Sequence, residues 1–297
     1  MKKIMCSLGI VVSFMGMSAL PAVAGPPFTN IEGVGGVALN PLAFVANGIK
    51  ADGTGLFGST VVSKPNVGYW HIGMGDSDIN WEAVGANMSF WNVIEIGYGH
   101  EFVSIDDVTN VEKNNFSAKV NFLKEGDWYP ALAVGAIYKD TNFTVTNDDS
   151  DIDYYAVASK HFMDLPMPIV LSAGVVSTKG YVRGVLGFGD DRDEAFFGNF
   201  EILPTKKMDG CPEILKGLIV GIDYLDGTTV GTHLDTHAVW NAHVAWMYKE
   251  LTLIAAYVYS GSDEVRDFAT GIRSVPPSAF GDGWCLSMQY HLNFAIT

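Results

Sequence analysis

The chain has 297 residues and a formal net charge of −15, with 48% hydrophobic and only 17% charged residues. A typical soluble domain carries roughly 25% charged residues, so this composition is unusually apolar. Nucleic-acid phosphates are bound mainly by Lys and Arg, and the acidic balance therefore excludes nucleic acid as a partner.

The first 24 residues have the pattern of a cleaved signal peptide. Lys2 and Lys3 form a basic start, an apolar stretch runs from Leu8 to Leu20, and Ala22-Val23-Ala24 is a small-residue cleavage site. Beyond this signal there is no apolar run of about 18 residues that would predict a transmembrane helix. We therefore expect an exported chain that is apolar overall without long apolar runs.

The C-terminal stretch from Trp284 to Thr297 alternates almost perfectly between apolar and polar residues. Such a period of two is typical of a β-strand with one apolar and one wet face. Membrane β-strands need roughly 9 to 11 residues, so this strand is long enough to cross a bilayer. The pattern favours an outer-membrane β-barrel.

Reading the whole chain for the same period predicts an all-β protein with about twelve strands, within a range of about 10 to 14. The predicted strands are Asn66–Gly75, Asn80–Ser89, Asn92–Val103, Asn115–Phe122, Pro130–Lys139, Ile152–Phe162, Ile169–Thr178, Glu194–Leu203, Lys216–Leu225, Thr236–Tyr248, Leu251–Tyr259 and Trp284–Thr297. We expect residues 66–297 to form a transmembrane, antiparallel, up-and-down barrel.

The predicted connections alternate in length, as they do in outer-membrane barrels. Short periplasmic turns are expected near Trp91, Lys124–Trp128, Met163–Met167 and Lys249, with a longer one at Pro204–Leu215. The predicted external connections, mostly long and acidic, are Asp76–Ile79, Ser104–Lys113, Asp140–Asp151, Lys179–Asp193, Asp226–Asp235 and Gly261–Asp282. This alternation supports an even number of strands.

Aromatic residues fall at both predicted ends of the strands, where membrane barrels carry aromatic girdles. The predicted periplasmic girdle contains Phe90, Trp91, Trp128, Tyr129, Trp246, Tyr248 and Phe294, and the external girdle contains Phe102, Tyr138, Tyr259 and Trp284. The alternative is a secreted β-sandwich, in which these aromatics would be core residues, but sandwiches favour shorter strands.

The Gly-rich segment from Gly25 to Pro65 lacks clear alternation. Three placements stay open for it: it plugs the lumen, packs beneath the barrel, or adds an edge element. If it fills the lumen, a simple diffusion pore is disfavoured.

Alternation also points a set of polar residues into the predicted lumen. These candidates are Glu95, Glu101, Lys119, Asn121, Glu201, Asp223, Asn241, His243, Gln289, His291 and Asn293. A hydrated lumen would solvate them, whereas a dry core would make their burial costly. The small residues Ala131, Ala133 and Gly135 predict that one wall is not filled by bulky side chains.

Two loop motifs are weak metal candidates. His233, Asp235 and His237 alternate on one segment, and residues 147–153 are rich in Asp, but both fit polar loops equally well. A barrel enzyme would need a nucleophile beside a base, and the histidines are scattered over different strands. We expect no catalytic residue, no metal and no cofactor.

Two motifs carry a family resemblance. Residues 31–43 (IEGVGGVALNPLA) and 128–139 (WYPALAVGAIYK) resemble a family of proteobacterial proteins known only as a domain of unknown function. The resemblance implies a Gram-negative envelope protein and an outer-membrane barrel. It implies no reaction, ligand or functional residue.

These observations predict a monomeric protein of the cell outer membrane, surrounded by lipid and lipopolysaccharide. The leading hypothesis is a passive pore, or a transport or binding channel for small solutes. The alternative is an envelope structural or surface-interaction protein that transports nothing. A barrel-embedded enzyme that modifies lipid is the third hypothesis.

Overall fold

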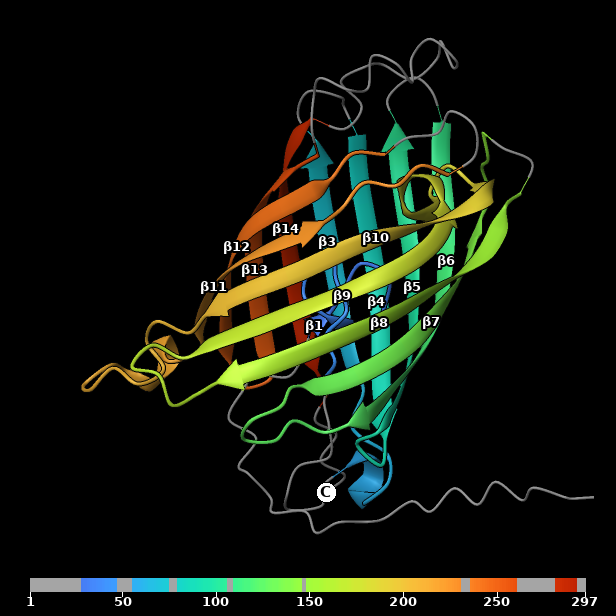
Figure 1. The fold of residues 1–297 in the computed structure, drawn as a ribbon. Helices are drawn as coiled ribbons and strands as arrows, with labels where there is room; N and C mark the ends of the chain where they lie inside the picture. Colours follow the sequence, from blue (N-terminus) through green and yellow to red (C-terminus); the bar gives the residue numbers. More distant parts are fainter. Residues whose placement is uncertain are drawn as a thin grey trace, which may run out of the picture.

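The computed structural model describes residues 28–46, 55–74, 79–105, 109–145, 148–230, 236–260 and 281–292. Twelve antiparallel strands form one closed barrel (Figure 1). Each strand pairs with the next in chain order, and the last strand pairs with the first to close the ring. The prediction of a twelve-stranded up-and-down barrel of the outer-membrane type is confirmed. The predicted signal peptide lies outside the described residues.

The barrel strands have the following bounds. They are β3 (Asn66–Met74), β4 (Ile79–Phe90), β5 (Ile94–Ile105), β6 (Thr109–Leu123), β7 (Ala131–Thr141), β8 (Ser150–Phe162), β9 (Ile169–Gly180), β10 (Phe188–Ile202), β11 (Leu218–Leu225), β12 (Val239–Tyr248), β13 (Leu251–Tyr259) and β14 (Asp282–His291). Two short strands, β1 (Phe28–Thr29) and β2 (Gly35–Gly36), pair with each other, and there are 3₁₀ turns η1 (Leu56–Gly58), η2 (Tyr181–Gly184) and η3 (Glu213–Leu215).

The period of two separates an apolar exterior from a buried interior. On β14, Trp284, Leu286 and Met288 are 67%, 56% and 54% exposed, whereas Cys285 and Gln289 at the alternate positions are 2% and 0% exposed. Large apolar side chains on the outside of a monomer are costly in water but favourable against lipid. The exterior is therefore suited to a bilayer.

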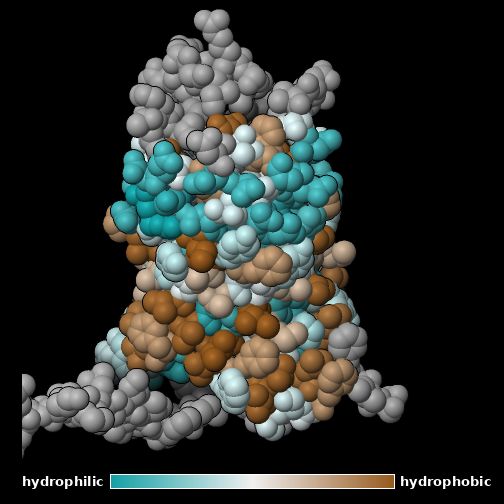
Figure 2. Space-filling view, turned by 90° about the vertical axis from the view of Figure 1, so that its right-hand side faces the viewer, coloured by the Kyte–Doolittle hydropathy of each residue, from teal (hydrophilic) through white to brown (hydrophobic). Residues whose placement is uncertain are grey.

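The apolar exterior does not extend to the full height of the strands. On β6, Phe116 and Phe122 are exposed, but Asn110 and Glu112 occupy the outward positions nearer the β5–β6 connection. Figure 2 shows the same division on one face, with a polar band near one end of the barrel and mainly apolar surface towards the other. The strands therefore continue beyond the apolar zone into a polar rim.

This rim corrects two of the predicted external connections. Ser104–Lys113 was expected to be a loop, yet β5 and β6 are paired as far as Ile105 and Thr109. Lys179–Asp193 was also expected to be a loop, but β10 begins at Phe188. In the rim the outward residues no longer face lipid, so the apolar-out pattern on which the prediction depended is lost there.

The two ends of the barrel differ in their connections. At one end, strands are joined through residues 91–93, 124–130, 163–168, 203–217 and 249–250. The connections at the other end, here called the long-connection end, include residues 142–149, 181–187 and 226–238. In outer-membrane barrels the shorter turns face the periplasm. The aromatic side chains of Trp91 and Trp128 at the short-turn end are 61% and 96% exposed, as a girdle requires; Phe294 lies outside the described residues.

Two further features concern helices and thiols. None of the helices in the described ranges has the length and apolar character needed to cross a membrane. Cys211, in the 203–217 connection, and Cys285, on β14, are both free thiols.

Candidate functional site

Residues 28–46, here called the inner segment, run through the interior of the barrel (Figure 1). The segment makes hydrogen bonds to side or main chains of nine of the twelve strands, namely β3, β4, β5, β6, β7, β8, β10, β11 and β14. Strands on all sides of a closed barrel can reach a single segment only if it lies inside. The inner segment is therefore surrounded by the wall.

Lys119 and Glu95 form the main attachment of the inner segment. The Lys119 ammonium donates to the carbonyls of Gly35 (2.8 Å), Leu42 (3.1 Å) and Phe44 (2.8 Å). The Glu95 carboxylate accepts from the backbone N–H groups of Gly35 (2.7 Å) and Ala46 (2.5 Å). Because an irregular segment cannot pair its own backbone groups, these charged side chains replace the missing partners.

Amide and indole groups hold the beginning of the inner segment around Thr29. Gln289 accepts from the Thr29 N–H at 3.1 Å and donates to the Thr29 carbonyl at 3.1 Å. Trp70 donates its indole N–H to the same carbonyl at 2.7 Å, and Asn87 donates to the Thr29 hydroxyl at 3.1 Å. The buried polar residues of β3, β4 and β14 are thus used to bind backbone.

The opposite wall holds the middle of the segment. Asn40 donates to the Asn199 side chain and to the Tyr224 carbonyl, both at 2.9 Å. Arg183 donates to the Leu39 carbonyl at 3.0 Å. The segment is therefore attached to β10 and β11 as well as to β5 and β6.

Close approach to the wall depends on glycine at one position. Gly33 has φ +81°, and a Cβ there would overlap the backbone carbonyl of Tyr98 on β5. Only glycine combines this backbone conformation with the absence of a side chain. The Gly-rich composition of the segment therefore has a packing function at this position.

A cluster of charged groups lies beside Glu32 of the inner segment. The Glu32 carboxylate contacts Arg183 (2.7 Å), Lys139 (2.5 Å) and Lys113 (3.7 Å). Lys113 also pairs with Glu101 at 2.9 Å, and Lys139 pairs with Asp153 at 2.7 Å. Three cations thus meet three carboxylates, so the formal charges of this cluster cancel.

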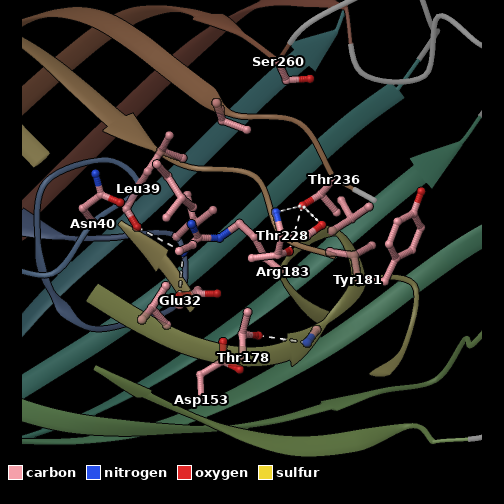
Figure 3. A pocket seen from close by; sticks show the side chains of 18 of the residues that line it. Glu32, Leu39, Asn40, Asp153, Thr178, Tyr181, Arg183, Thr228, Thr236 and Ser260 are labelled. Carbon is pink, nitrogen blue, oxygen red and sulfur yellow. Dashed lines mark hydrogen bonds and ion pairs between the residues drawn. The ribbon is translucent and has the colours of Figure 1, made fainter. Parts of the chain in front are cut away.

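A cavity of about 160 Å³ lies between the inner segment and the long-connection end. Glu32, Arg183 and Asp153 border it on the side of the inner segment, and Thr228, Thr236 and Ser260 border it towards the long-connection end (Figure 3). Its wall between these two ends is mostly apolar; among the lining residues are Ile72, Met74, Ile79, Val103, Phe197 and Leu186.

The connection between β9 and β10 also contributes to this cavity. Residues 181–187 turn inward, with Tyr181, Val185 and Leu186 only 1%, 2% and 3% exposed. Arg183 in this turn donates to the Leu39 carbonyl at 3.0 Å, which joins the turn to the inner segment. An inward turn of this kind narrows the interior near the long-connection end.

The structure buries ten of the eleven predicted lumen-facing residues. Their exposed fractions are 9% or less; they are Glu95, Glu101, Lys119, Asn121, Glu201, Asp223, Asn241, His243, Gln289 and His291. Asn293 lies outside the described residues. Glu95, Lys119, Asn121 and Gln289 bind the inner segment directly. A role of these residues in solute passage stays a prediction.

Five charged residues of the site were missed by the sequence analysis. They are Glu32, Lys113, Lys139, Asp153 and Arg183. Lys113 continues the inward phase of Lys119 just beyond the predicted strand, so a longer strand would have found it. Lys139 and Asp153 lie at inward positions within predicted strands, and the alternation alone could have identified them. Glu32 and Arg183 lie off the barrel strands, where alternation carries no information.

The polar candidates do not make up the whole interior, because near the long-connection end its lining also includes Ile72 and Met74, which are 5% and 8% exposed. One expectation about the interior is wrong. The wall around Ala131, Ala133 and Gly135 was expected to lack bulky side chains. Instead the Tyr155 ring covers Gly135, and the two alanines pack in a cluster with Val34 of the inner segment.

Two histidines bear on the weaker chemical hypotheses. His243 lies 3.0 Å from the Asn241 side-chain oxygen and 4.0 Å from carboxylates of Glu201 and Asp223, so neither ring nitrogen bonds to a serine. Of the metal candidates in the 226–238 connection, His233 and Asp235 lie outside the described residues, whereas His237 borders the cavity.

The fold and its interior define the class of this protein: a twelve-stranded barrel of the outer-membrane type whose interior is occupied by its own N-terminal segment. The chain belongs to the family described as Protein of unknown function (DUF3034), whose model matches residues 25–271. The family suggested by the two sequence motifs is thereby confirmed.

Comparison with solved structures finds other barrels. The chain is similar to a KdgM porin (10% identity, TM-score 0.49, covering 77% of this chain and 99% of that one) and to a NanC porin (7%, 0.46, 77% and 100%). It is also similar to the outer membrane protein Omp33 of Acinetobacter baumannii (10%, 0.44, 78% and 99%). No protein with a curated description matches. With each of these TM-scores below 0.5, we draw no functional conclusion from these similarities.

Proposed function

We propose that this protein is a porin-like channel of the Gram-negative outer membrane that takes up or binds small solutes, and that the inner segment closes it. The observation that supports closure by this segment is the way it is attached to the wall. Lys119 alone donates hydrogen bonds to three of its carbonyls, and Glu95 accepts hydrogen bonds from two of its N–H groups. A segment attached by polar contacts can exchange them for water when it moves.

The wall does not need the inner segment in order to be complete. Every barrel strand is already paired on both sides, so the segment supplies no strand to the ring. Its departure would therefore leave no open sheet edge. This is the arrangement expected of a gate and not of a structural strand.

The location in the outer membrane follows from two features. The exterior carries exposed Leu286, Met288 and Val244 (56%, 54% and 47%), as a lipid-facing surface does. The first 24 residues have the pattern of an export signal. We further expect the protein to function as a monomer surrounded by lipid and lipopolysaccharide, without a catalytic step.

Single-channel recording in planar bilayers tests the proposal. We expect the wild-type barrel to be closed for most of the time, with brief openings. The double variant E95Q/K119M, which removes both charges that hold the segment, should be open for a much larger fraction of the time. Lys207→Met, which removes an exposed lysine from the 203–217 connection, is the matched control and should resemble the wild type.

A covalent tether supplies the opposite test. Thr29 Cγ2 lies 2.8 Å from the position that a Cβ would take at Gly85 on β4, a separation suited to a disulfide. In a Cys211→Ser background, T29C/G85C should abolish openings when oxidised and restore them when reduced. Silence of the wild type and of folded E95Q/K119M at all voltages would refute the channel and favour the alternative, an envelope structural protein with a permanently filled lumen.

A further inference from the structure

We infer that the cavity beside the inner segment is a binding site for a small, uncharged molecule with an apolar body and one hydrogen-bonding group, such as a phenol. This inference rests on the proposed function, because it names the class of solute that the closed channel would hold. The argument depends on the size of the cavity, the character of its wall and the polar atoms at one end.

The volume suits a molecule of about one aromatic ring. The cavity measures about 160 Å³. An apolar cavity of about 150 Å³ is known to accept benzene. Sugars and larger solutes would require the inner segment or the 181–187 turn to move.

The wall favours an apolar body. Ile72, Met74, Ile79 and Val103 line one side, from β3, β4 and β5, and Phe197 of β10 is a further lining residue. All five side chains are at most 8% exposed. A strongly hydrated solute would lose water against these side chains without gaining partners, whereas an apolar solute gains free energy by leaving water.

The charged groups at the cavity disfavour an ionic solute. Glu32 is opposed by Arg183, Lys139 and Lys113, and the carboxylates of Glu101 and Asp153 complete the balance. No net charge of this cluster is left over to neutralise an ion. Asp226 also lines the cavity, where its carboxylate would repel an anion and already accepts hydrogen bonds from the Tyr224 hydroxyl and the Gly227 N–H. Burial of an uncompensated ion is costly, so a neutral molecule is favoured.

Polar atoms of residues that line the cavity can recognise one hydrogen-bonding group of the ligand. Three residues that line the cavity have a buried atom without a hydrogen-bond partner among the described residues: the Tyr155 hydroxyl, Asp153 Oδ1 and Arg183 Nε. Buried polar atoms in proteins are nearly always paired. The Tyr155 hydroxyl can both donate to and accept from a ligand.

Binding can be measured by fluorine NMR on the barrel in lipid nanodiscs, with empty nanodiscs as the reference. The probes are 4-fluorophenol, 4-fluorotoluene and, as the charged analogue, 4-fluorobenzoate. We expect saturable binding of the phenol and of the toluene, and none of the benzoate. Signals equal to those of empty nanodiscs, or benzoate binding as tight as phenol binding, would overturn the inference.

Two variants assign the binding to this cavity. Ala195→Phe, at a buried position that lines the cavity, should weaken both neutral probes at least tenfold, whereas Ala118→Phe on the exterior of β6 should have no effect. Tyr155→Phe keeps the ring and should weaken only 4-fluorophenol, by about three- to tenfold, the effect of one neutral hydrogen bond. Equal losses for phenol and toluene in Tyr155→Phe would contradict the assigned polar contact.

The binding test and the conductance test can refute the ligand class and the channel independently of each other. Probe binding by a barrel that never conducts would refute the channel and leave the ligand class standing. Openings in the bilayer without saturable probe binding would refute the ligand class and leave the channel standing.

Discussion

Lys119 and Glu95 lie directly opposite each other on β6 and β5, with Nζ and Oε2 3.1 Å apart, and both bind the same inner segment. Both side chains are 1% exposed. The cross-strand pair thus neutralises itself and at the same time supplies donors and acceptors to an irregular backbone. This double use explains why a buried ion pair can be placed in the wall without a hydrated pore around it.

Lys119→Met should release the inner segment more strongly than the double variant E95Q/K119M. The single change leaves the Glu95 carboxylate buried without its cation, which typically costs about 3–5 kcal/mol, whereas removal of both charges costs less. At about 1.4 kcal/mol per tenfold change, exchange of the Gly35 and Ala46 amide protons should accelerate more than a hundredfold in K119M. Hydrogen exchange measured by mass spectrometry reports this acceleration. If the effects of Lys119→Met and Glu95→Gln simply added up to that of the double variant, the two charges would not be coupled.

Gly33→Ala should displace the inner segment, whereas Gly58→Ala should not. Both glycines have positive φ, at +81° and +74°, so both substitutions introduce similar backbone strain. Only Gly33 faces a neighbour, the Tyr98 backbone, and a Cβ at Gly58 meets nothing within 4 Å. Protease cleavage within residues 28–46 should therefore become faster in Gly33→Ala alone. Equal cleavage of the two variants would show that strain, and not seating against β5, decides the result.

The fold was predictable because lipid imposes a simple rule on the exterior. Where one face meets lipid and the other meets polar groups, residues such as Met288 and Gln289 must alternate, and the alternation is visible in the sequence. In the polar rim the rule no longer applies. Residues such as Asn110 and Glu112 then face water, and strand ends were consequently assigned to loops.

The interior was less predictable because it depends on a segment without a period. The backbone groups of residues 28–46 are paired with side chains from the wall, and such partners leave no local pattern in the segment itself. Glu32 and Arg183 come together only through the fold, from positions 151 residues apart in sequence (183 − 32). The polar residues of the wall could be found, but what they bind could not.

Cys211 should react with a maleimide reagent in the folded protein and Cys285 should not. Cys211 is partly exposed in the 203–217 connection, and Cys285 is 2% exposed on the inner face of β14. The mass of the folded mature protein should increase by one label, and that of the unfolded protein by two. The Cys211→Ser variant should take up none when folded. Labelling of Cys285 in the folded barrel would show that the interior near β14 is open to solvent.

Acid should weaken the attachment of the 124–130 turn to β8 through Glu125. Burial alone would raise the pKa of this carboxyl, but hydrogen bonds from His161 and from Lys160 outweigh it, and the pKa lies below its ordinary value of 4.5. The His161 backbone N–H donates to Glu125 at 2.8 Å, and the Lys160 ammonium lies 3.1 Å from the same carboxylate. A carboxyl whose pKa is lowered by folding stabilises the folded state above its unfolded pKa.

This stabilisation is therefore complete above about pH 4.5 and disappears as the pH falls through the lower pKa of the folded state. The thermal midpoint of the wild type should exceed that of Glu125→Gln at pH 7, and the difference should shrink steadily as the pH falls below about 4.5. Glu213→Gln is the control, because the Glu213 side chain is 82% exposed and should show little difference across this pH range. The imidazole of His161 also stacks on Phe44 of the inner segment, with ring centroids 4.1 Å apart. Loosening of Glu125 should consequently increase hydrogen exchange around Phe44 as well, and a response confined to the turn would show that the stack does not transmit it.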